Sequence, residues 1–531
     1  MSSFKFGARG IPFASSPWWE IDDDEDPIRT AWSARSMVLW GGLRPIASQL
    51  VLDASVVAGL LYGALSKASY HSIATLLGVL GLVLATSGPT NRWTLTIPMV
   101  PLLVLQGLRY LPVMEKAPRA VFIVIAVLSV LCILAGAALS ILFPAVELPP
   151  IQGPYNVGVV DFHLPVELKD QHACTHVPVR LLYPTHESPQ RLPYLDPSYS
   201  SEFCGQMMKL GAPPQLANLG WMLHTWRLTP LRARRGASIA PSEEPFPLVL
   251  FSHGLGGAPA IYSYQTMSLA AHGHVVLSLT HQDGSSPAVP QLDGSLQTFD
   301  FDILKLYQDG KELEYAKERR RRTERRVDEL LEATEAMRRL NEEDWLDGLP
   351  SLVGKLNLDR TFFMGHSFGA ATALSAALRA PDRAHAVVAH EPAIDWMPDE
   401  VRRSLYSEDR LEGLTNQYKG GTGGFPSDLK NHSNDLHDKP MLFLNSHEWH
   451  SKGWCDVMEE MHQKGRLGRQ PGSEFVVIEA AHHNEFSDTS LLTPTWLARA
   501  VGATGKKKPA DTAHEIATRT RSFINLVLQQ S

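Results

Sequence analysis

A ten-residue stretch, from Thr361 to Ala370 (TFFMGHSFGA), constrains the fold of this chain more than any other. Its apolar, β-prone beginning leads into Gly-x-Ser-x-Gly, and an Ala- and Leu-rich helical run follows as far as Arg379. Strand, sharp turn and helix in this order are the context of a nucleophile elbow, where small flanking residues avoid clashes on a strained turn. Ser367 is therefore the candidate nucleophile. The motif needs support from other segments, because it arises by chance in about one in six chains of this length.

A second stretch predicts the oxyanion hole of an acyl-transfer site. The continuous apolar run from Phe246 to Ser252 is typical of a central parallel strand, and it ends in the Gly-rich loop His253–Gly257 (HGLGG). This loop lacks the Lys-Ser/Thr of a P-loop and the spacing of a dinucleotide fingerprint. An oxyanion loop fits better, and the backbone N–H groups of Leu255 and Phe368 are the two expected donors.

Strand-like and helical segments alternate beyond residue 155, which favours a mostly parallel sheet. Residues 186–245 carry many prolines and are expected to form loops and short helices. Apolar runs after the elbow helix predict strands at residues 384–389, 439–445 and 475–478. The sequence therefore predicts an α/β-hydrolase fold with a mostly parallel central sheet, formed by residues 155–531.

The candidate acid and base each come directly after one of these strands. Glu391 follows the first strand, and Asp395, four residues on, competes with it. The strand-end position favours Glu391. Two adjacent histidines, His482 and His483, follow the last strand. The order serine, acid, histidine along the chain is that of the α/β hydrolases.

These side chains can perform acyl transfer without a metal or an organic cofactor. A serine hydroxyl becomes a nucleophile when an imidazole takes its proton, and a carboxylate fixes the tautomer of that imidazole. The chain has four cysteines, and neither a Cys-x-x-Cys motif nor a Cys/His cluster predicts zinc.

The charge pattern does not favour nucleic acid as a partner, since the net charge is −7. One basic run, Lys317–Arg326, lies in a predicted helix from Lys311 to Asn341. Acids interleaved with the basic residues and an apolar stripe favour a solvated helix face, and contact with lipid headgroups is the alternative.

The first 154 residues differ in composition from the rest. Residues 1–36 form a polar, acidic tail, residues 37–146 carry successive apolar runs, and residues 147–154 form a Pro-rich linker. The runs are each near the ~20 residues that cross a bilayer, so they predict an all-α segment of three to four transmembrane helices and a multi-pass integral membrane protein. They lie between residues 44 and 67, 67 and 92, 92 and 109, and 120 and 146.

The orientation of these spans is left open, because basic residues flank both sides about equally. Asp53, inside the first span, is either a functional carboxyl or, as we favour, one that is neutral or hydrogen-bonded to a neighbouring helix.

Taken together, the motifs resemble the calcium-independent platelet-activating-factor acetylhydrolases, a family with an α/β-hydrolase fold. The resemblance covers roughly residues 155–530 and includes the Arg-rich helix. Its segments are FSHGLG (251–256), AHGHVV (271–276), THQD (280–283), GHSFG (365–369) and HNEFSD (483–488).

The resemblance implies that Ser367 is the nucleophile and that Glu391 stands where the family usually has an aspartate. It favours His483 as the base, because His483 keeps the spacing to the FSD segment, and His482 is the runner-up. His253 and His366 are then structural members of their loops. His281 and Asp283 are expected to order a loop beside the site.

The resemblance also implies a substrate. The expected reaction is hydrolysis of the short or oxidised sn-2 ester of a glycerophospholipid, at a bilayer, giving a lysophospholipid and a free acid. The alternatives are an esterase or lipase of other specificity and a non-catalytic membrane scaffold with a degenerate hydrolase domain. The oligomeric state is not predicted.

Overall fold

The structure is a computed structural model. It describes residues 100–530, except for the gaps 103, 106–107, 109–110, 144–145, 168–175, 213, 399–400, 402–438, 465–467 and 469.

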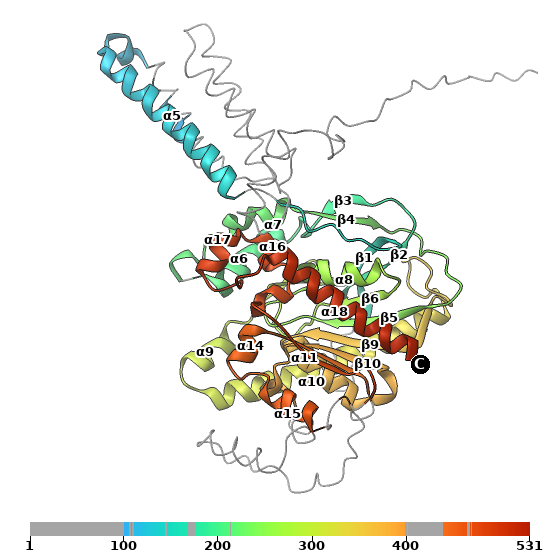
Figure 1. Cartoon of the computed structure of the whole chain (residues 1–531). Helices are drawn as coiled ribbons and strands as arrows, with labels where there is room; N and C mark the ends of the chain where they lie inside the picture. The colour runs from blue at the N-terminus through green and yellow to red at the C-terminus, as the bar shows by residue number, and fades with distance from the viewer. Residues whose placement is uncertain are drawn as a thin grey trace, which may run out of the picture.

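A ten-stranded sheet forms the centre of the domain (Figure 1), in the order β12-β11-β10-β9-β5-β6-β2-β1-β4-β3. The strands from β12 to β6 run parallel to one another. β2 lies antiparallel to β6, and β1 antiparallel to β2. The mostly parallel sheet of the α/β-hydrolase type is therefore confirmed. The strands are β1 (Asn156–Pro165), β2 (His176–Thr185), β3 (Gln190–Pro193), β4 (Pro230–Arg235), β5 (Phe246–Ser252), β6 (Val275–Leu279), β9 (Leu356–His366), β10 (Ala386–His390), β11 (Met441–Ser446) and β12 (Glu474–Ile478). A separate hairpin pairs β7 (Ala288–Pro290) with β8 (Leu296–Thr298).

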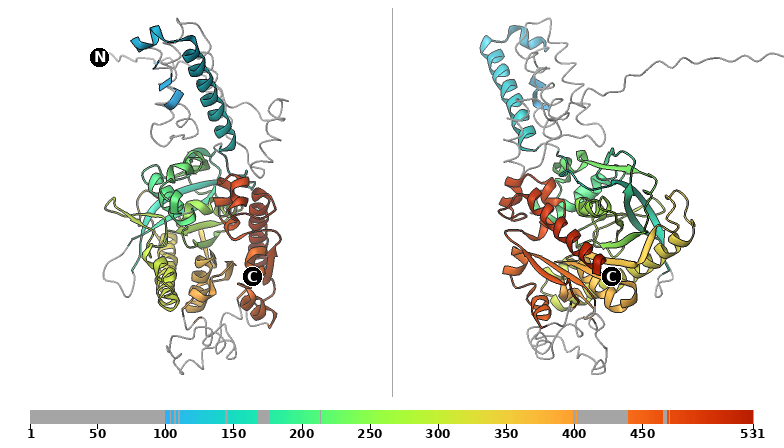
Figure 2. Two further views of the ribbon diagram at one scale, coloured as in Figure 1. Left: turned by 90° about the vertical axis from the view of Figure 1, so that its left-hand side faces the viewer. Right: turned by 45° about the vertical axis from the view of Figure 1, so that its right-hand side comes forward.

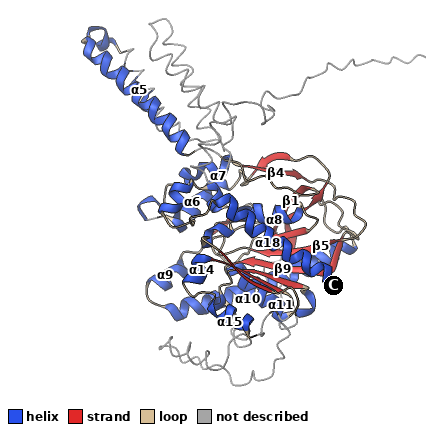
Figure 3. Cartoon of the chain, in the orientation of Figure 1, coloured by secondary structure: helices blue, strands red, loops and turns tan. Residues whose placement is uncertain are grey.

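Helices cover both faces of the sheet (Figures 2 and 3). The longer ones are α6 (Ser200–Gly211), α8 (Ser263–Ala270), α10 (Glu312–Glu342), α11 (Phe368–Arg379), α15 (Asp456–Gln463) and α18 (Pro509–Gln530). Shorter turns of helix are α7 (His224–Leu228), α9 (Asp302–Gln308), α14 (His447–Ser451), α16 (Thr489–Leu492) and α17 (Thr495–Ala500). The 3₁₀ turns are η3 (Pro112–Lys116), η4 (Pro214–Leu216), η5 (Gly220–Leu223), η6 (Pro259–Tyr262), η7 (Pro381–Arg383), η8 (Ile394–Trp396) and η10 (His483–Phe486).

Side chains of the central strands alternate between two cores. Leu248 and Leu250 of β5 belong to the core that includes α10 and α11, whereas Val249 and Phe251 belong to the core that includes α8 and α18. Successive side chains of a strand point to opposite faces, so a continuous apolar run is what a strand buried on both faces requires.

The edge of the sheet differs from the prediction for residues 186–245. This region contains two strands, β3 and β4, which pair antiparallel, with Pro193 opposite Pro230. Prolines are tolerated at sheet edges, where one side of a strand needs no ladder donor. The helices between the two strands, among them α6 and α7, agree with the expected loops and short helices, whereas some of the prolines that suggested loops belong to two paired strands at the sheet edge.

Helix α5 (Arg119–Leu142) projects away from the domain (Figure 1). Within the described residues it is the one helix long and apolar enough to cross a membrane, over residues 119–139 with a mean hydropathy of 2.9. Many of its side chains are exposed, for example Ile123 at 63% and Leu134 at 57%. The last of the predicted spans coincides with this helix. The first two spans with Asp53, and most of the third, lie outside the described residues, so the structure supports one candidate span and not three to four.

Candidate active site

Ser367 occupies the turn between β9 and α11. Its φ is +56°, in the left-handed region that costs most residues energy. Its N–H donates to the carbonyl of His390 at 2.8 Å. A Cβ on Gly365 would lie 2.2 Å from the Gly369 carbonyl oxygen, and one on Gly369 would lie 1.9 Å from the Ser252 carbonyl oxygen. Both glycines of the elbow are therefore required by close backbone approach.

Glu391 follows β10 and is fully buried. Its Oε1 accepts the backbone N–H of Ser446 at 2.9 Å, and its Oε2 accepts the Nδ1–H of His483 at 2.5 Å. Oε2 also lies 3.2 Å from Nε2 of His366. Burial alone would raise the pKa of Glu391, but His483 and His366 hold it well below its usual range. The other candidate acid, Asp395, is exposed on η8.

His483 begins η10 and faces this carboxylate. The indole of Trp449 stacks on its ring, with centroids 4.6 Å apart, and its backbone N–H donates to Glu448 at 3.0 Å. Because Nδ1 carries the proton given to Glu391, Nε2 is the nitrogen left to accept one. Its ring lies 4.6 Å from that of His366, the residue before Ser367. The neighbouring His482 instead places Nδ1 3.0 Å from the carbonyl of Gly502.

The two predicted oxyanion donors lie on adjoining segments. Ser252, at the end of β5, pairs with Gly365 of β9, so the loop that carries Leu255 starts beside the elbow. Phe368 is the first residue of α11, and a first-turn N–H has no acceptor within its own helix. The helix N-terminus also favours negative charge.

Arg326 supports both of these segments, and the sequence did not single it out. This fully buried side chain donates to the His253 carbonyl at 2.7 Å and to Asp283 at 2.8 Å, and it donates to Ser285 as well. Its guanidinium carbon lies 4.0 Å from the centre of the Phe368 ring. The expected loop-ordering role of Asp283 was the available signal, because a buried carboxylate needs a partner.

The prediction of a solvated basic helix face is wrong for three members of the run. Arg319, Arg322 and Arg326 are buried, at spacings of three and four residues that share one helix face. They pack on the domain because their partners lie elsewhere in the chain, as Asp300 does for Arg322.

A second serine–histidine–acid arrangement lies behind the oxyanion loop. The Ser252 hydroxyl is 2.8 Å from Nε2 of His281, and Nδ1 of His281 is 2.7 Å from Glu329. His281 and Glu329 have no exposed side-chain surface, and Ser252 is also fully buried. A substrate cannot reach this hydroxyl, so hydrogen bonding that fixes the loop is the role left for it.

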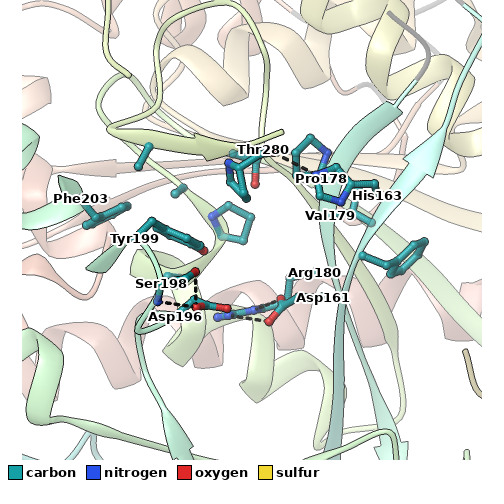
Figure 4. A pocket seen from close by; sticks show the side chains of 16 residues that line it. Asp161, His163, Pro178, Val179, Arg180, Asp196, Ser198, Tyr199, Phe203 and Thr280 are labelled. Atoms are coloured by element: carbon teal, nitrogen blue, oxygen red, sulfur yellow. Dashed lines mark hydrogen bonds and ion pairs between the residues drawn. The ribbon is translucent and has the colours of Figure 1, made fainter. Parts of the chain in front are cut away.

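A cavity of about 220 Å³ lies beside the oxyanion loop (Figure 4). Ala258–Ala260, which follows the loop, lines it, as do Tyr199 and Phe203. Arg180 also lines the cavity, and its Nε and Nη2 donate to Asp161 at 2.7 and 3.2 Å. The cavity therefore combines a charged pair with aromatic and apolar walls.

His366, Glu391 and His483 offer one ligand atom each within 4.8 Å of one another, a spacing that suits a metal ion. Two of these contacts are hydrogen bonds to Glu391, and Nδ1 of His366 lies 3.0 Å from the Tyr262 hydroxyl. The two imidazole nitrogens that face Glu391 are therefore hydrogen-bonded to its carboxylate.

Comparison with known proteins identifies the family. The model of the family described as "Platelet-activating factor acetylhydrolase, isoform II" matches residues 140–409 and 424–529. The chain belongs to this family. The family resemblance drawn from the motifs is confirmed, and the family is one of carboxylic ester hydrolases.

Individual relatives are distant. Platelet-activating factor acetylhydrolase of Cavia porcellus is 25% identical over 376 residues, covering 68% of this chain and 74% of the relative. The protein of the same name from Canis lupus familiaris is 26% identical over 239 residues, covering 43% of this chain and 52% of the relative. Among solved structures, a ferulic acid esterase from Streptomyces cinnamoneus aligns with a TM-score of 0.46 and 17% identity, over 71% of this chain and 92% of that one.

Proposed function

We propose that the chain is a membrane-anchored serine esterase with Ser367 as nucleophile, His483 as base and Glu391 as acid. The observation that carries the proposal is the 2.5 Å contact between Glu391 and His483, beside the strained turn of Ser367. Leu255 and Phe368 supply the oxyanion hole.

The reaction proceeds through an acyl-enzyme. Nε2 of His483 takes the Ser367 proton as Oγ attacks the ester carbonyl, and the N–H groups of Leu255 and Phe368 stabilise the oxyanion. The intermediate collapses when His483 gives that proton to the leaving alkoxide. Water, deprotonated by His483, then attacks the acyl-serine. The free acid leaves as His483 gives the proton to the Ser367 oxygen. Glu391 stays ionised and stabilises the imidazolium in both halves.

The proposed substrate is a glycerophospholipid with a short or oxidised sn-2 acyl group, such as platelet-activating factor, which gives a lysophospholipid. Family membership supports this class. Helix α5, with the apolar runs before it, is the proposed multi-pass anchor that holds the site near lipid.

Hydrolysis of phosphatidylcholines with acetyl or palmitoyl at sn-2 tests the proposal, with purified full-length protein in detergent and excess chelator. Acetyl-selective release by wild type, and none by Ser367→Ala, is the expected result. Turnover of a simple ester but of neither lipid would point to another esterase specificity. No turnover of any ester, with no labelling of Ser367 by a fluorophosphonate, would leave the non-catalytic scaffold.

A further inference from the structure

A buried chain of hydrogen bonds joins the oxyanion loop to the acid. The Gly254 N–H donates to the Tyr262 hydroxyl at 3.1 Å, and this hydroxyl lies 3.0 Å from Nδ1 of His366. Nε2 of His366 lies 3.2 Å from Oε2 of Glu391, the same oxygen that His483 contacts. Tyr262 is 3% exposed, His366 4% and Glu391 0%.

The direction of every proton in this chain is determined. A backbone N–H only donates, so the Tyr262 oxygen accepts from Gly254. At the other end, the ionised carboxylate of Glu391 only accepts, so Nε2 of His366 carries the proton that Glu391 receives. His366 is neutral, because burial, with the nearby His483, lowers its pKa to about 4. A neutral imidazole that donates at Nε2 accepts at Nδ1, so the Tyr262 hydroxyl donates its proton to Nδ1 of His366.

We propose that Tyr262 and His366 are positioning residues that couple the oxyanion hole to the triad. Tyr262 holds Gly254, and with it the adjoining Leu255 N–H, at a fixed distance from the elbow. His366 shares one carboxylate oxygen with His483, so it orients Glu391 and limits the negative charge that Glu391 presents to the base. The roles of Leu255, Glu391 and His483 rest on the proposed function.

Among the described residues, few charged groups contact His483. Glu391, after β10, accepts its Nδ1–H, and His366, at the end of β9, donates to the same carboxylate oxygen. Glu448 of α14 contacts its backbone N–H, and His482 adjoins it. Only His366 links this group to the oxyanion loop through described hydrogen bonds.

Three substitutions separate the support of the oxyanion loop from the contact with Glu391. Tyr262→Phe removes the hydroxyl but keeps the ring beside Phe251, 4.9 Å away between centroids. His366→Asn keeps a polar atom near the Nδ1 position and loses the contact with Glu391. His366→Gln keeps a donor near the Nε2 position and loses the contact with Tyr262. Tyr183→Phe is the matched control, since the buried hydroxyl of Tyr183 donates to the Ala237 carbonyl and takes no part in this series of hydrogen bonds.

The assay is hydrolysis of p-nitrophenyl acetate by the full-length protein across pH, which needs no lipid specificity. Tyr262→Phe and His366→Gln should lower kcat about tenfold with KM unchanged. This loss is smaller than the roughly 10²–10³-fold loss expected when an oxyanion donor is removed, because the donor is displaced and not lost. His366→Asn should raise the pKa of the acid limb of kcat/KM by roughly 0.5–1 unit, because Glu391 then acts on His483 alone.

Two results would overturn the proposal. One is a fall in kcat for Tyr262→Phe no larger than that for Tyr183→Phe. The other is an acid limb that does not move in His366→Asn, a variant that tests the coupling even if Tyr262→Phe fails to fold. If wild type hydrolyses p-nitrophenyl acetate but no phospholipid, the proposed substrate fails while this test still stands.

Discussion

Replacing Arg326 by methionine should destabilise the domain and impair the oxyanion hole at once. The guanidinium is fully buried and donates to Asp283 and to the carbonyl of His253. Methionine fills much of the space of the side chain but provides no donor. Asp283, which is also buried, would then carry its charge without a cation beside it.

The magnitude follows from this unpaired carboxylate. Breaking a buried ion pair by removing one partner costs on the order of 3–5 kcal/mol. In a domain of about 375 residues, such a loss should lower the melting temperature by roughly 4–6 °C. Removing both charges, in Arg326→Met with Asp283→Asn, should recover part of the loss, since no charge is left unpaired. The fall in kcat should be about tenfold, because the Phe368 ring and the His253 carbonyl both lose their support.

The dependence on pH gives a further check on Arg326. Burial would raise the pKa of Asp283, but Arg326 holds it well below its usual range. The stabilisation from this pair is therefore present above the unfolded pKa of about 3.9 and is lost as the pH falls. The difference in melting temperature between wild type and Arg326→Met should narrow below about pH 4.

Thermal unfolding of the full-length protein in detergent measures these differences. Arg321→Met is the matched control, because Arg321 lies on the same helix, is mostly exposed and pairs with Glu318. An exposed pair of this kind contributes about 0–1 kcal/mol. Two results would contradict this expectation. One is a melting temperature of Arg326→Met within 2 °C of that of the Arg321→Met control, which is roughly the limit that one exposed pair allows. The other is a further fall in melting temperature when Asp283→Asn is added to Arg326→Met.

Three further outcomes are expected. Fluorophosphonate should still label Ser252→Ala but not Ser367→Ala, because the Ser252 hydroxyl is buried against His281; labelling is read on a gel. Glu391→Gln should lower kcat by roughly 10³–10⁴-fold, as expected when the carboxylate that fixes the tautomer is lost, whereas Asp395→Asn should change it less than about threefold. Burial raises the pKa of Asp488 to about 7, so its contribution to stability falls as the pH rises from about 4 to 7. The melting temperature of Asp488→Asn relative to wild type should therefore rise over that interval.

The sequence predicted the parts of the fold that local patterns determine. The central strands are continuous apolar runs, and the elbow is a short motif whose glycines face fixed backbone neighbours, so both were visible in one segment at a time. The edge strands β3 and β4 were missed because prolines at an edge and prolines in a loop give the same local pattern.

The choice between Glu391 and Asp395 needed tertiary information. Both carboxylates follow the same strand, four residues apart, and the sequence only favoured the nearer one. In the structure Glu391 adopts a φ of +50° and is fully buried against Ser446 and His483, whereas Asp395 is exposed. Ser446 and His483 are 55 and 92 residues away in the chain, so no local pattern could contain them.

The Arg-rich helix shows why composition and position must be weighed separately. A run of charges predicts a solvated face, yet the 3.6-residue period places Arg319, Arg322 and Arg326 on the side that faces the domain. Burial of so many charges is tolerated because each cation meets a carboxylate, a carbonyl or an aromatic ring contributed by another segment. Since one of these rings belongs to Phe368, the same contacts that satisfy the buried charge also fix a proposed oxyanion donor. A helix that composition assigns to solvent is in this way part of the support for the active site.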